Sequence, residues 1–87
     1  MTTRELFQQL KALNSACREA LSAEDFKKVN ALLQLKRELF QFLKQMTFTP
    51  DDLPLVREAL AEEKALAGLA IQKKRDLQGR LKQMAYH

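Results

Sequence analysis

The stretch from Leu32 to Met46 constrains the fold of this chain more than any other part of the sequence. On a helix with 100° per residue, its large apolar side chains fill an arc of roughly 180°, whereas one neighbouring helix covers a stripe of about 100°. Polar residues occupy the opposite side. The sequence therefore predicts an amphipathic helix that packs against two partners and does not span a membrane. The apolar arc consists of Leu32, Leu33, Leu35, Leu39, Phe40, Phe42, Leu43 and Met46.

One charged residue, Lys36, points into this arc, one turn before Leu39 and Phe40. A lysine in such a position extends its ammonium group to water, pairs with an acid or meets a partner. We expect Lys36 either to pair with an acid of the last helix, such as Glu62 or Glu63, or to lie at a surface that binds a partner.

Capping signals and apolar spacing predict three helices, near residues 3–21, 23–46 and 52–85. Thr2 and Glu5 form a capping box at the start of the first helix, and the run from Ser22 to Asp25 is a second capping signal that leaves almost no loop. Pro54 fits only in the first turn of a helix, so the third helix should begin near Asp52 or Leu53. We expect an all-α fold, an antiparallel three-helix bundle with a long C-terminal helix. The narrow stripe of the first helix consists of Leu6, Leu10, Leu13, Cys17 and Ala20, with Asn14 outside it.

The third helix has two apolar faces and is longer than the other two. It should overhang them or bend, at Gly68 or Gly79 where a bend costs least. The two faces either serve the two neighbouring helices, or one of them binds another chain. A further hypothesis is that the part beyond Gly68 folds back over the binding surface when no client is present. The main stripe contains Leu53, Val56, Leu60, Ala67, Ile71, Leu77, Leu81 and Met84, and the second face contains Leu55, Leu66 and Leu69.

The length of 87 residues predicts one small domain over residues 1–87. Such a domain encloses a modest core and is often supported by oligomerisation or by a partner. Two Gly, two Pro and no Trp agree with a nearly all-helical chain. No apolar run approaches about 18 residues and the N-terminus has no signal-peptide pattern, so we expect a cytoplasmic protein without membrane insertion.

The sequence offers little for catalysis. The chain has one Cys, Cys17, and one His, His87 at its last position, which predicts no disulfide framework, no metal site, no cofactor and no catalytic residue. Cys17 lies in the first apolar stripe, where a free Cys acts as a small hydrophobe. The one enzymatic alternative is a small helical enzyme that grips an anionic substrate with Lys36 and Arg37. We therefore expect a protein that is not an enzyme.

The apolar arc exceeds what a small core needs, which predicts a surface that binds a protein client. We expect the client to bind through an amphipathic helix, with an affinity in the micromolar range. Self-association, for example as a homodimer, explains the same excess without a client. The predicted binding residues are Leu35, Lys36, Phe42, Leu55, Leu66 and Leu69.

The charge is uneven along the chain. Residues 49–71 carry a net charge of −3 and residues 72–87 a net charge of +4. Cations near a helix C-terminus complement the helix dipole and often form a solvated face; the alternative is a site for an acidic partner or a nucleic-acid backbone. No aromatic residues alternate with the basic ones, which disfavours nucleic acid. The predicted basic patch consists of Lys73, Lys74, Arg75, Arg80 and Lys82.

A central run in the second helix, Leu33-Lys36-Leu39 continuing to Leu43, resembles the FliT type of bacterial flagellar export chaperone. The long last helix, which ends Arg80-Leu81-Lys82-Gln83-Met84-Ala85-Tyr86, resembles the same family. The resemblance implies a small cytoplasmic helical protein that holds a flagellar subunit, typically the filament cap, before type III export. Contacts to the export apparatus or to a transcriptional activator would follow from it. The alternatives are a self-associating structural bundle and a small basic nucleic-acid-binding or regulatory protein.

Overall fold

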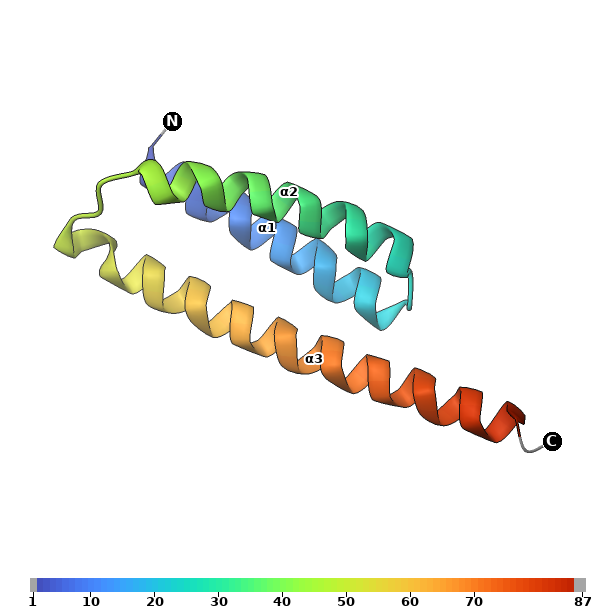
Figure 1. Ribbon diagram of the computed structural model, residues 1–87. Coiled ribbons are helices and arrows are strands. Elements are labelled where there is room, and N and C mark those ends of the chain that lie inside the picture. The colour runs from blue at the N-terminus through green and yellow to red at the C-terminus, as the bar shows by residue number, and fades with distance from the viewer. Residues whose placement is uncertain (1, 86–87) are drawn as a thin grey trace.

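A computed structural model describes residues 2–85, and within them the chain is helical apart from short connections (Figure 1). Helix α1 spans Thr3–Ser22, α2 spans Phe26–Gln45 and α3 spans Leu53–Ala85; the short 3-10 helix η1, Pro50–Asp52, precedes α3. The three α-helices run up, down and up, so the predicted antiparallel three-helix bundle with a long C-terminal helix is confirmed. The molecule is elongated, measuring 57 × 20 × 18 Å along its principal axes. None of the described helices is long and apolar enough to cross a membrane.

The helices begin at side-chain caps. The Thr2 hydroxyl accepts a hydrogen bond from the Glu5 amide at 3.2 Å, and the Glu5 carboxylate accepts one from the Thr2 amide, so the predicted capping box is confirmed. At the third helix, the Asp52 carboxylate accepts hydrogen bonds from the Thr49 amide at 3.0 Å and from its hydroxyl at 3.2 Å. These caps satisfy amides that lack an intrahelical acceptor, and they fix where the helices begin.

The turn between α1 and α2 differs from the prediction. The second helix begins at Phe26 and not at Ala23, because α1 ends in a Schellman motif that uses the residues expected to start α2. Glu24 has a left-handed φ of 58°, its amide donates to Leu21 O at 3.1 Å, and the Asp25 amide donates to Ala20 O at 2.9 Å. The cap of α2 is Asp25, whose carboxylate accepts from the Lys28 amide at 3.2 Å.

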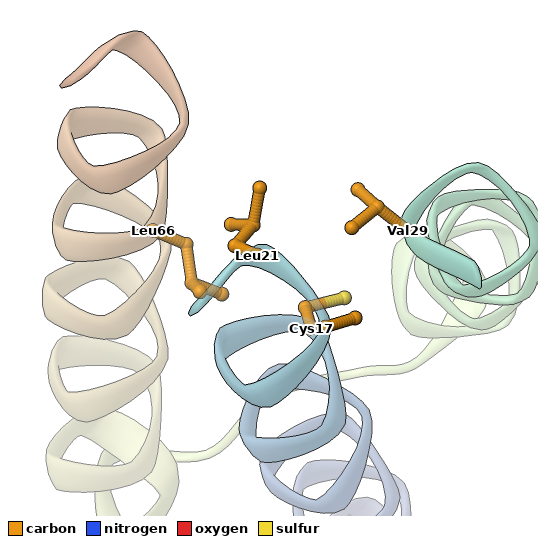
Figure 2. Close-up of a cluster of buried hydrophobic side chains, with 5 residues drawn as sticks. Cys17, Leu21, Val29 and Leu66 are labelled. Atoms are coloured by element: carbon orange, nitrogen blue, oxygen red, sulfur yellow. The ribbon is translucent and has the colours of Figure 1, made fainter. Parts of the chain in front are cut away.

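Helix α1 lies at the centre of the bundle, with α2 and α3 packed on it from two sides. The wide apolar arc of α2 predicted that this helix packs against two partners, but α1 is the helix that both of the others cover. In Figure 2, α1 lies between the other two: Leu66 of α3 points toward Leu21, and Val29 of α2 approaches Cys17. A second buried cluster joins Leu6 and Leu10 of α1 to Leu39 and Leu43 of α2.

The central position of α1 widens its buried stripe beyond the sequence prediction. Asn14, which was expected outside the stripe, is only 1% exposed, as is Leu10. A helix with two neighbours must bury a wider arc than a helix with one, and Asn14 lies between the two contact faces.

Helix α3 is continuous past Gly68 and Gly79, and its last part extends beyond the α1–α2 turn (Figure 1). The overhang predicted from its length is confirmed. The hypothesis that the segment beyond Gly68 folds back over the bundle is wrong, since helical hydrogen bonding carries α3 straight on to Ala85.

Candidate protein-binding grooves

Two apolar grooves follow the helices. The first, named here the outer groove, lies between α1 and α2 and has a volume of about 710 Å³. Its walls are residues three or four positions apart on each helix, which therefore share a face. It is lined by Leu6, Gln9, Ala12 and Leu13 of α1 and by Leu35, Glu38, Leu39, Phe42 and Met46 at or after α2.

The floor and the rim of the outer groove differ in burial. Leu6 and Leu39 are 3% and 6% exposed and belong to the core, whereas Leu35 and Phe42 are 49% and 63% exposed. Polar groups enter at the edges through Gln9 and Glu38. Two large apolar side chains are thus exposed to solvent beside a buried apolar floor. The apolar face of an incoming helix can cover such a surface.

The second, named here the α2–α3 groove, lies between α2 and α3, and it also measures about 710 Å³. Phe48 of the loop lies against Phe7 of α1, with ring centroids 6.1 Å apart, and this contact holds the loop at one end of the groove. The groove is lined mainly by Phe7, Leu10, Phe40, Leu43, Phe48, Leu53, Val56, Leu60 and Glu63. A narrower continuation, bounded by Leu33, Lys36 and Ala67 among others, follows it toward the α1–α2 turn.

An ion pair bridges α2 and α3 between these two sections. Lys36 Nζ lies 2.7 Å from Glu63 Oε1 and 2.9 Å from Oε2, so the predicted pairing of Lys36 with an acid of the third helix is confirmed. The Lys36 side chain is 6% exposed and that of Glu63 is 32% exposed. Beside it, Asn14 Nδ2 donates to Glu62 Oε2 at 2.9 Å. The two adjacent acids of α3 thus serve different neighbours, Glu62 toward α1 and Glu63 toward α2.

The predicted binding residues divide among several environments. Leu35 and Phe42 lie together in the outer groove, with exposed apolar surface. Leu66 is 6% exposed and belongs to the core, and Leu69 packs against the same cluster. Leu55 lines a small depression between α1 and α3, with Phe7 and Ala59. The sequence analysis assigned these residues of α2 and α3 to one surface, but the structure separates them.

The outer groove also contains residues that the sequence prediction did not include. Leu6, Leu13 and Met46 were assigned to helix packing alone, yet they form part of the groove wall. Their signal was present in the sequence, because the apolar stripe of the first helix and the arc of the second had to meet along one edge.

The predicted basic residues lie on the overhanging part of α3. Lys74, Arg75 and Lys82 are exposed, whereas Arg80 donates a hydrogen bond to the Glu24 carboxylate at the α1–α2 turn. This contact raises the pKa of the Arg80 guanidinium and lowers the pKa of Glu24, to which the positive charge of Lys73 also contributes. The basic patch therefore has one part tied to the turn and one part facing solvent.

The groups most often used in catalysis do not meet in the described part of the chain. Residues 2–85 contain no group of three His, Cys, Asp or Glu side chains placed to hold a metal ion. The Cys17 thiol is buried, and its desolvation raises its pKa. His87, and Tyr86 of the motif at the end of the last helix, lie outside the described residues. The geometry thus offers apolar grooves and ion pairs between helices.

Comparison of the chain with protein-family models, curated proteins and solved structures found no match.

Proposed function

We propose that this chain is a non-catalytic protein-binding module whose outer groove receives an amphipathic helix of a client. The observation that carries this proposal is the exposure of Leu35 and Phe42 beside the buried floor formed by Leu6 and Leu39. Helix-in-groove binding uses such a surface, since apolar residues of the ligand at three- and four-residue spacing cover the exposed rim.

The expected affinity is moderate. A ligand helix that buries about 600 Å² of apolar surface gains about 15 kcal/mol at about 25 cal/mol per Å². Losses of translational, rotational and side-chain freedom on association offset much of this gain. Binding in the micromolar range suits a partner that is held and then released.

We further propose that the client is a flagellar subunit of the filament-cap type, held in the cytoplasm before type III export. This part rests on the resemblance of the Leu33-Lys36-Leu39 run and of the α3 terminus to FliT-type chaperones. The helical hairpin and the apolar outer groove give such a chaperone a means of holding its client without chemistry.

Affinity capture from the native cells with two matched variants tests the proposal. The variant Leu35→Ser/Phe42→Ser removes the rim of the outer groove, whereas Leu33→Ser changes the same residue type on the same helix but toward the α2–α3 groove. We expect the wild type and Leu33→Ser to capture the same flagellar subunit and the double variant to lose it. Equal capture by all three proteins would exclude the outer groove as the client-binding site. Capture of no flagellar protein would reject the chaperone role.

A further inference from the structure

An apolar stripe with several exposed side chains runs along α3. Heptad-like spacing places ten residues on one stripe, named here the α3 seam. Leu60, Leu81 and Met84 of the seam are 65%, 57% and 73% exposed. The packing of α3 on α1 uses a different face, which contains Leu66. The seam consists of Leu53, Val56, Leu60, Glu63, Ala67, Ala70, Lys74, Leu77, Leu81 and Met84.

The order of residues in the α3 seam is complementary to itself in the antiparallel direction. In an antiparallel pair of helices, the two alternating positions of a heptad seam face each other. Each apolar residue then meets an apolar residue, and the two charged residues of the seam meet with opposite sign. Glu63 already pairs with Lys36 of its own chain, so Lys74 of the other copy would be a second cation beside this carboxylate. The resulting pairs are Leu53 with Met84, Val56 with Leu81, Leu60 with Leu77, Glu63 with Lys74 and Ala67 with Ala70.

A parallel pair of the same helices would be unfavourable. Glu63 would then face Glu63 and Lys74 would face Lys74, and like charges opposite each other in a seam oppose pairing. The antiparallel pair also places small residues, Ala67 and Ala70, at its centre, where they let two backbones approach closely. Sequence and charge therefore select one direction and one register.

The α2–α3 groove has the position that this arrangement requires. Leu53, Val56 and Leu60 line the groove, and in the antiparallel register they face residues 77–84 of the other copy. Those residues belong to the overhang of α3, beyond the α1–α2 turn (Figure 1). The net charge of −3 over residues 49–71 would meet the net charge of +4 over residues 72–87. The overhang of one copy therefore matches the groove of the other in apolar surface and in charge.

We propose that two copies of this chain form an antiparallel dimer along the α3 seam, in which each overhang enters the α2–α3 groove of the other copy. Each overhang completes a local four-helix bundle with α1, α2 and the first half of α3. The dimer leaves the outer groove, with Leu35 and Phe42, on a different side of α2. It does not depend on the proposed client binding, and the two proposals are tested by different variants.

Cysteine cross-linking tests the register. A mixture of Leu60→Cys and Leu77→Cys proteins places two thiols opposite each other, whereas each variant alone keeps its thiols roughly 25 Å apart along the seam at 1.5 Å per residue. We expect mild oxidation of the mixture to yield at least several-fold more disulfide-linked dimer than either variant alone. The native Cys17 is buried, so wild-type protein serves as the background control. Equal cross-linking by a single variant, or none by the mixture, would overturn the register.

A charge reversal tests the dimer itself. Lys74→Glu places Glu opposite Glu63 in two layers of the dimer, and we expect the dimer dissociation constant to rise about a hundredfold, roughly tenfold for each layer. Lys82→Glu makes the same change on the overhang but outside the seam, and we expect a change of no more than about threefold. Sedimentation equilibrium gives both constants, with helicity measured to show that the fold is retained. A wild type that stays monomeric up to about millimolar concentration would overturn the dimer, as would equal effects of the two variants.

Discussion

The ion pair between Lys36 and Glu63 allows a prediction with a definite asymmetry. The Lys36 side chain is 6% exposed, so removal of its partner strands an ammonium group away from water. The Glu63 side chain is 32% exposed, so its carboxylate can hydrate when the lysine is removed. The two single substitutions should therefore have unequal costs, although each breaks the same contact.

Substitution by methionine keeps the volume of both side chains similar and removes the charge. We expect Glu63→Met to lower the free energy of unfolding by about 3 kcal/mol, the lower end of the range for breaking a buried pair. Lys36→Met should cost about 1 kcal/mol or less, because apolar burial offsets part of the loss. The double variant Lys36→Met/Glu63→Met should lie near the wild type, since neither charge is then left without a partner.

Urea unfolding followed by circular dichroism, at a concentration low enough to keep the chain monomeric, measures these differences. A loss of about 3 kcal/mol corresponds to a fall in Tm of more than about 10 °C for a domain of this size. Glu58→Gln is the control, because Glu58 pairs with Lys11 on the exposed surface and its removal should leave the unfolding curve unchanged. Equal costs for the two single Met variants, or a double variant as unstable as Glu63→Met, would refute the argument from exposure.

Four further predictions concern the turn, its ion pair, the thiol and the core. Glu24→Gly and Glu24→Ala both lose the contact with Arg80, but only glycine adopts the left-handed φ of 58° without strain, so thermal scans should give Glu24→Gly the higher Tm. Arg80 lowers the pKa of Glu24, so the pair stabilises the fold fully above the ordinary glutamate pKa of about 4.5. This stabilisation should be lost as the pH falls through the lowered pKa of Glu24. In acid titrations of stability, Glu24→Gln should not show this loss. The Cys17 thiol, buried and with a raised pKa, should react with a thiol reagent at pH 8 only after unfolding, and fast labelling of the native protein would contradict its placement. Leu10→Ala should cost about 3 kcal/mol in urea unfolding, and Leu35→Ala less than about 1 kcal/mol; similar costs would contradict the assignment of Leu10 to the core and Leu35 to the groove rim.

Local signals in the sequence predicted most of the helix boundaries. The Thr2 capping box and the Pro50–Asp52 segment set the starts of α1 and α3 within a residue or two, because caps act on the nearest free amides. The turn at Glu24 was mispredicted because a Schellman motif usually uses glycine, and a glutamate at this position gave no such signal.

The packing was harder to predict than the helices. The width of an apolar arc indicates how much surface a helix can bury, but not whether the chain itself provides the partner. The arc of α2 was the widest, yet Leu35 and Phe42 remain exposed, while the narrower stripe of α1 is covered on two sides. The pairing of Lys36 was predictable because a lysine inside an apolar arc needs an acid, and Glu62 and Glu63 were the acids at the right height on the third helix.

Photo-cross-linking in the native cells tests the central claim, that the outer groove holds a protein client. Benzoylphenylalanine replaces Phe42, which is 63% exposed in the groove, and in a control protein it replaces Phe26, which is 36% exposed at the start of the same helix and outside the groove. The account predicts that irradiation links a flagellar subunit to position 42 and not to position 26, with the product identified by mass spectrometry. Cross-linking of that subunit from position 26 as readily as from position 42, or no protein client at position 42, would contradict it.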